Sequence, residues 1–105
     1  MELPQRPRGL RKPFVAAIEI TEIISERQLS TRTSDLSVHG CSVLTPTPLN
    51  PRVKVRIAIV HAGTRVVAFG HVVSARADGM SIAFDKIEGR DQAVLERWMS
   101  DLRVN

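Results

Sequence analysis

Apolar and polar residues alternate along much of this chain with the period of two that is typical of half-buried β-strands. The clearest case is the segment 53–60, where every second residue from Val53 to Ile59 is Val or Ile. Alternation or β-branched residues predict further strands at 14–24, 27–33, 40–45, 65–76 and 80–84. About six strands with short connections are typical of a small, closed or partly open antiparallel β-barrel, so the pattern predicts a mainly β fold.

Turn-forming residues stand where these strands end. A hairpin is expected near residues 25–26, and the proline-rich segment 46–51 lacks N–H donors that a β-ladder needs. The segments 61–64 and 77–79 should each reverse the chain, and Gly70 suggests a bend or bulge within a long strand. The predicted strands are therefore joined by short connections.

From about residue 89 the apolar spacing changes to three or four, which predicts an amphipathic helix over residues 89–103. Its apolar positions are Val94, Leu95, Trp98, Met99 and Leu102. Asp91 lies near the positive end of this helix and Arg103 near its negative end, as the helix dipole favours. A helix this short gains most of its stability from packing, so we expect it to pack on the barrel or to close its open end.

The first thirteen residues form a basic segment of a different kind. Arg6, Arg8, Arg11 and Lys12 against Glu2 leave a net charge of +3 in residues 1–12, out of +4 for the whole chain. Three prolines and few apolar residues predict a flexible arm over 1–13, ahead of a single domain over 14–105. The charge favours an anionic ligand, and a solvated basic tail is the alternative.

Composition excludes several other classes of protein. No apolar run approaches the roughly 20 residues of a membrane-spanning helix, and the polar start lacks the apolar segment of a secretory signal. A cytoplasmic protein without membrane insertion is therefore expected. The single cysteine, Cys41, has no partner for an internal disulfide, and its place in an apolar strand indicates a core residue.

The residues most typical of a ligand site form the hexapeptide Asp35-Leu36-Ser37-Val38-His39-Gly40, between two predicted strands. Asp and Ser favour turns because their side-chain oxygens bond nearby N–H groups, and Gly40 permits backbone angles that other residues avoid. Arginine supplies a planar pair of donors that suits phosphate oxygens and the acceptor edge of guanine. The hexapeptide and the arm together predict a site for a guanine nucleotide.

Catalytic and metal sites fit the sequence poorly. Asp35, Ser37 and His39 are two residues apart along an extended chain, about 6.6 Å, whereas a catalytic triad needs each group hydrogen-bonded to the next. His39, His61 and His71 show no spacing of metal ligands. We therefore expect neither an enzyme nor a metal or cofactor. His61 is interpreted as a solvated turn residue and His71 as a strand residue on the barrel wall. For His39 two interpretations stay open, a residue that donates to phosphate or stacks on a base and a plain exposed residue.

Binding of nucleic acid is the natural alternative for a small basic barrel. Such barrels usually stack bases on aromatic side chains, and this chain has three Phe, one Trp and no Tyr. Trp98 lies on the apolar face of the predicted helix and Phe84 ends a strand that is predicted to be buried. Little remains to stack bases, so nucleic acid is disfavoured.

These features together resemble the PilZ domain, the bacterial receptor module for cyclic di-GMP. The shared parts are an arginine pair before the first strand, the pattern Asp/Asn-x-Ser-x-x-Gly, the strand order and the closing helix, and they cover nearly the whole chain. The resemblance implies that Asp35 and Ser37 contact guanine and phosphate, that Gly40 shapes the turn, and that two arm arginines bind the phosphates. Ligand binding would order the arm, and the new surface would meet a downstream protein partner.

The arginine spacing departs from the family pattern, in which three residues separate the two arginines. Arg11 fits the second position, but Pro7 occupies the first. Gly9 would let Arg8 reach the first position, with Arg6 as the alternative, or Arg8 and Lys12 would keep the spacing with lysine in second place. A PilZ-like adaptor that binds no nucleotide and acts through protein contacts in pilus or motility machinery is the alternative function.

Overall fold

The computed structural model describes residues 11–102, and its sheet follows the predicted alternation closely. In these residues it has seven strands and one helix: β1 (Lys12–Pro13), β2 (Ala17–Glu22), β3 (Gln28–Leu36), β4 (Gly40–Leu44), β5 (Lys54–His61), β6 (Thr64–Arg76), β7 (Gly79–Ile87) and α1 (Gly89–Asp101). Six strands correspond to the predicted ones, and β1 is additional. Residues 1–10 of the predicted arm and Arg103, the last residue of the predicted helix, lie outside the described residues.

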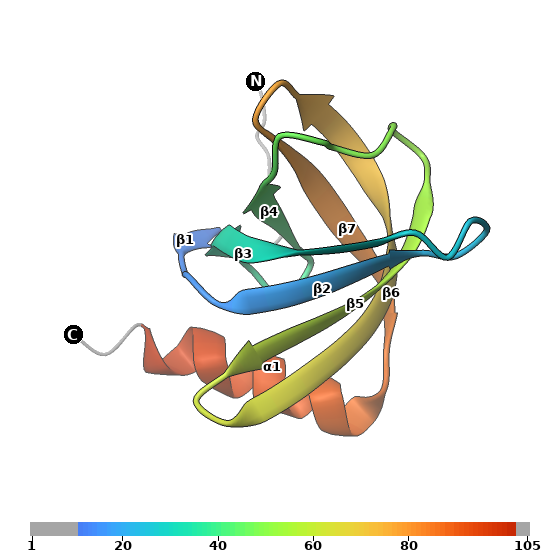
Figure 1. Ribbon diagram of the computed structural model, residues 1–105. Coiled ribbons are helices and arrows are strands. Elements are labelled where there is room, and N and C mark those ends of the chain that lie inside the picture. The colour runs from blue at the N-terminus through green and yellow to red at the C-terminus, as the bar shows by residue number, and fades with distance from the viewer. Residues whose placement is uncertain (1–10, 103–105) are drawn as a thin grey trace, which may run out of the picture.

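The strands form one antiparallel sheet in the order β1-β3-β2-β5-β6-β7-β4, as Figure 1 shows. A further pairing between β3 and β4 joins the sheet to itself, which closes the barrel. Closure removes the unpaired edges that an open sheet of this size would expose. The predicted small antiparallel barrel is therefore confirmed.

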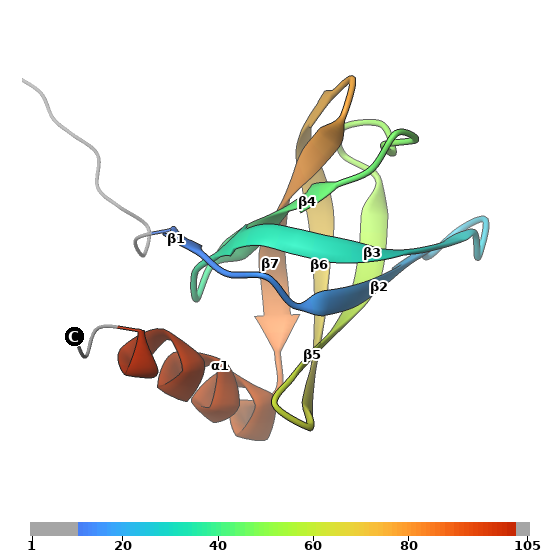
Figure 2. The same ribbon diagram turned by 60° about the vertical axis from the view of Figure 1, so that its left-hand side comes forward.

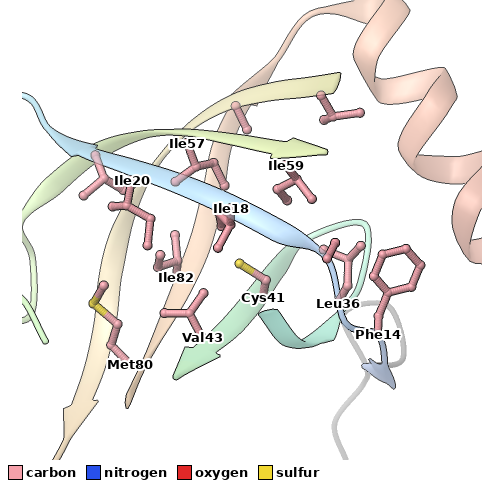
Figure 3. Packing of buried hydrophobic residues seen from close by; sticks show 14 of the residues in the cluster. Phe14, Ile18, Ile20, Leu36, Cys41, Val43, Ile57, Ile59, Met80 and Ile82 are labelled. Atoms are coloured by element: carbon pink, nitrogen blue, oxygen red, sulfur yellow. The ribbon is translucent and has the colours of Figure 1, made fainter. Parts of the chain in front are cut away.

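The barrel interior is filled by one member of each alternating pair. Val55, Ile57 and Ile59 of β5 are fully buried, while Lys54, Arg56 and Val60 are exposed; the small Ala58 is also buried. Figure 3 shows side chains from opposite walls meeting in this core. Burial of each such side chain typically contributes about 1.5–3 kcal/mol, so the period of two in the sequence is also the main source of stability.

Cys41 of β4 belongs to this core, as the sequence predicts. Its side chain is fully buried, and burial raises the pKa of the thiol to about 12. A thiol with a raised pKa stays protonated near neutral pH and is a poor nucleophile. Cys41 is therefore a structural residue.

Helix α1 lies across one end of the barrel, where it overlaps the lower part of the β5–β6 hairpin in Figure 1 and lies to the left of that hairpin in the turned view of Figure 2. It buries Leu95 and Trp98 there. The Trp98 ring stacks on Phe14 with 5.9 Å between ring centroids and meets the His61 ring edge-on at 5.3 Å. The prediction that His61 is a solvated turn residue is wrong, because it ends β5 and packs against both of these aromatic rings.

Candidate ligand-binding site

The base of the N-terminal arm lies beside the hexapeptide because β1 pairs with the end of β3. Lys12 is opposite Leu36 and Pro13 is opposite Asp35. The adjacent Phe14 donates its backbone N–H to the Ser34 carbonyl oxygen at 3.2 Å and buries its ring in the core. This pairing fixes the point at which the arm leaves the barrel, directly next to Asp35.

The hexapeptide is only partly a turn. Asp35 and Leu36 are the last residues of β3, and Gly40 is the first residue of β4. Leu36 is buried in the core, so its neighbour Asp35 projects to the outer face of the barrel, since successive strand residues alternate. The prediction of a turn throughout the motif is thus too broad, because strand alternation continues through its first two residues.

Ser37 holds the turn together. Its hydroxyl oxygen accepts the backbone N–H of His39 at 3.0 Å, its O–H lies 3.4 Å from the Gly40 carbonyl oxygen, and its own N–H donates to that oxygen at 2.9 Å. This is the local bonding by which Ser favours turns. The side chain is only 2% exposed, so in this conformation the hydroxyl serves the turn, and contact between Ser37 and a ligand stays a prediction.

Gly40 is required for close approach rather than for an unusual backbone angle. The φ angle of Gly40 lies outside the left-handed region. Among the described glycines, Gly63 is the one that adopts a left-handed φ. A Cβ atom at position 40 would overlap the carbonyl oxygen of Ile82 on β7 and would lie 3.2 Å from Nη2 of Arg11. The expectation that Gly40 supplies special backbone angles is therefore wrong: its missing side chain is what lets β7 and the Arg11 guanidinium approach.

Arg11 is held over this position by two hydrogen bonds. Its Nη1 donates to Oδ1 of Asp35 and to Oγ of Ser42, each at 3.0 Å. The Arg11 and Asp35 side chains are 40% and 32% exposed, so the pair is open to solvent and to a ligand. Asp35 Oδ1 also accepts the backbone N–H of Ser42 at 3.1 Å, which orients the carboxylate.

Ser42 is the site residue that sequence reasoning missed. It lies opposite Asp35 in the β3–β4 ladder, and its hydroxyl is 3.4 Å from the Ser81 hydroxyl on β7. The signal was available only through strand register: once β3 and β4 form a hairpin around residues 37–39, the outward residue opposite Asp35 is Ser42. It therefore belongs to the site through pairing rather than through any sequence motif.

The remaining predicted residues are distributed as follows. Lys12 lies in β1, half-buried, and His39 lies exposed in the turn, where its carbonyl oxygen accepts the N–H of Phe84 at 2.8 Å. Arg6 and Arg8 lie outside the described residues. Arg11, Asp35 and Gly40 are thus brought together, and ligand roles for all of these residues stay predictions.

Residues 11–102 contain neither a cluster of metal ligands nor a membrane-spanning helix. Within that range no three His, Cys, Asp or Glu side chains gather as metal ligands would. No helix in the same range is long and apolar enough to cross a membrane.

Several solved structures share this fold at low sequence identity. The inhibitor of motility MotI/DgrA of Bacillus subtilis superposes with a TM-score of 0.82 at 17% identity, covering 97% of this chain and 53% of its own, so this chain spans about half its length. The PilZ domain of YcgR from Escherichia coli, solved with cyclic di-GMP, has a TM-score of 0.76 at 18% identity, covering 93% and 92%. The PilZ domain of CeSA from a cellulose-synthesizing bacterium has a TM-score of 0.72 at 19% identity, covering 89% and 97%.

Sequence comparison identifies the family directly. Among curated proteins, none matches this sequence. The PilZ domain family, in contrast, matches residues 5–101, which include the hexapeptide, every strand and the whole of α1. With the barrel, its closing helix and β1 beside Asp35, this match shows that the chain belongs to the PilZ domain family.

Proposed function

We propose that this protein is a receptor for cyclic di-GMP, bound where the N-terminal arm meets the hexapeptide. The observation that carries the proposal is the placement of Arg11. The β1–β3 pairing brings it to the motif, Gly40 leaves room for its guanidinium, and Asp35 and Ser42 fix its orientation. The similar fold of the YcgR PilZ domain, which was solved with this ligand, supports it.

The arrangement suits a phosphate-containing ligand. A guanidinium has five N–H donors in a fixed plane, and among the described residues the Arg11 contacts are made by Nη1. The donors on Nη2 and Nε remain for phosphate oxygens or for the acceptor edge of guanine. Orienting one nitrogen in advance reduces the rotamer entropy that Arg11 would lose on binding.

The rest of the arm supplies the second half of the site in this proposal. Arg8, three residues before Arg11, is the nearest basic residue to the first arginine position of the family, and Gly9 gives it freedom to adjust. Ligand binding then shifts the population of arm conformations toward one that covers the site. The resulting surface is what a downstream protein partner would recognise.

Calorimetric titration of the purified protein with cyclic di-GMP, run beside GTP and cyclic AMP, tests the proposal. We expect saturable heat with cyclic di-GMP and none with the other two nucleotides at the same concentrations. The three ligands share phosphate and purine chemistry, so the comparison separates a specific site from general attraction to a basic arm. No heat and no NMR shift at high micromolar cyclic di-GMP would reject the receptor.

A PilZ adaptor that binds no nucleotide is the second candidate. The feature that favours it is Pro7, which stands four residues before Arg11, where the family pattern has arginine. Proline supplies neither charge nor a hydrogen-bond donor, so the site would lose half of its phosphate contacts. In that case the barrel would act through a protein surface alone, and the titration above would be silent.

Ser42→Ala is expected to weaken cyclic di-GMP binding about five-fold. The Arg11 guanidinium would lose one of the two contacts that fix it, and one hydrogen bond is typically worth about 1 kcal/mol. Ser42→Thr keeps the hydroxyl and should bind as the wild type does. Ser81→Ala, which removes the neighbouring hydroxyl but no contact of Arg11, is the matched control. Unchanged affinity in Ser42→Ala would show that Asp35 alone orients Arg11.

A further inference from the structure

The outer face of the barrel continues from Arg11 across two more strands. In the sheet register Gly40 of β4 lies opposite Ala83 of β7, and Ala83 lies opposite His71 of β6. The neighbours Cys41, Ile82 and Val72 are fully buried, so by alternation these three residues face outward in one row. Strands are about 4.8 Å apart, so the row extends about 10 Å from Gly40 to His71.

The residues in this row before His71 have very small side chains. Gly40 has no side chain, Ala83 has only a methyl group, and the adjacent row contains Ser42 opposite Ser81. Arg11 stands at one end, over Gly40, and His71 stands at the other. A flat ligand bound to Arg11 could therefore lie across β7 without meeting a large side chain until it reaches His71.

His71 is held at the far end by an acidic partner. Its Nδ1 lies 3.1 and 2.9 Å from the two carboxylate oxygens of Asp85 on β7, and its side chain is 37% exposed. Lys54 of β5 lies opposite His71 on its other side. With Nδ1 engaged by the carboxylate, Nε2 on the other side of the ring is the nitrogen available to a ligand.

We propose that His71 forms a second contact region of the ligand site, in which its Nε2 hydrogen-bonds the guanine base farther from Arg11. The inference rests on the proposed cyclic di-GMP function and extends its site from β4 to β6. Guanine suits this position because its edge carries the acceptors O6 and N7 as well as N–H donors, so either protonation state of the imidazole finds a partner. Asp85 is a positioning residue, because it fixes the ring through Nδ1.

One glutamine and one asparagine variant of His71 show which imidazole nitrogen binds the ligand. A glutamine side chain places its amide near the position of Nε2, whereas an asparagine places its amide near Nδ1 and preserves the contact with Asp85. We expect His71→Ala and His71→Asn to weaken binding about ten-fold, and His71→Gln to retain affinity within about three-fold of the wild type. If His71 served only to hold Asp85, asparagine would restore binding and glutamine would not, which would overturn the inference.

Arg65→Ala is the matched control for the loss of a cationic side chain and for an alanine substitution in β6. Arg65 is an exposed cation of β6, six residues or about 20 Å from His71, so its loss should leave affinity unchanged. Weakening by Arg65→Ala equal to that of His71→Ala would mean that the barrel attracts the ligand through its general charge, and the inference would be wrong.

NMR of the unmodified protein gives a readout that needs no variant to fold. The His71 imidazole signals, assigned through their correlations with the backbone of the unmodified protein, should move on addition of cyclic di-GMP, while those of His61 in the aromatic cluster under α1 should not. Saturable binding with stationary His71 signals would overturn this inference and leave the proposed function intact. Absence of binding by the wild-type protein would overturn both.

Discussion

Trp98→Ala is expected to lower the free energy of unfolding by about 3–5 kcal/mol, because it empties a large apolar site under the helix. Trp98 is only 7% exposed and contacts the rings of Phe14 and His61, so its loss removes one aromatic contact from each of them. Domains of this size have total stabilities of about 5–15 kcal/mol. Thermal unfolding should therefore begin more than about 10 °C earlier, which differential scanning calorimetry measures.

Leu102→Ala is the control for this prediction. Leu102 lies four residues after Trp98 on the apolar stripe of the sequence, but it is 41% exposed beyond the end of α1. Its truncation should change stability by no more than about 0.5 kcal/mol, as is usual for surface positions. If Leu102→Ala destabilised the protein as much as Trp98→Ala, the end of the helix rather than the aromatic cluster would anchor α1 to the barrel.

The strands and the helix were predictable because each depends on a local pattern. The alternation of β5 and the spacing around Trp98 require no knowledge of distant residues, and both elements appear within a residue or two of the predicted bounds. Even Gly70 fits, since the register of β6 shifts between Phe69 and Gly70. Local periodicity therefore predicts which segments form strands and the helix. It does not predict the sheet order, in which β2 pairs with β5.

The features that could not be predicted all depend on pairing between distant residues. Ser42 enters the site only because it lies opposite Asp35, and Gly40 is needed only because β7 passes beside it. His61 packs in an aromatic cluster because Phe14, 47 positions earlier in the chain, contacts its ring. The sequence shows which residue types are present but not the register in which strands pair. The chemical groups of the site could therefore be predicted, but not which of them lie next to each other.

The contact of Trp98 with Phe14 also changes how the arm is understood. Phe14 is 6% exposed and lies three residues after Arg11, with β1 between them. The base of the arm is thus anchored by the core residue that follows it, and removal of the chain up to Pro13 would cut away β1 and its pairing with β3 as well as basic residues. Single substitutions at Arg11 therefore separate recognition from folding better than a truncation does.

Arg11→Ala should weaken cyclic di-GMP binding roughly ten- to a hundred-fold, the usual effect of losing a charge-assisted contact worth about 1.5–3 kcal/mol. Stability should change little, since an ion pair as exposed as that of Arg11 and Asp35 contributes at most about 1 kcal/mol. Calorimetry and thermal unfolding of the same sample measure the two effects. Arg11→Lys keeps the charge without the planar pair of donors and should bind with intermediate affinity.

Combining Arg11→Ala with Asp35→Ala shows what the pair does for the ligand. If Asp35 acts only by orienting Arg11, its removal should cost nothing further once Arg11 is absent, and the two effects will be strongly non-additive. If Asp35 contacts guanine itself, as the family resemblance implies, the second substitution should weaken binding again. Full affinity in Arg11→Ala would instead place the phosphates on other arm residues, and Arg8→Ala, Arg6→Ala and Lys12→Ala would then show which of them binds the ligand.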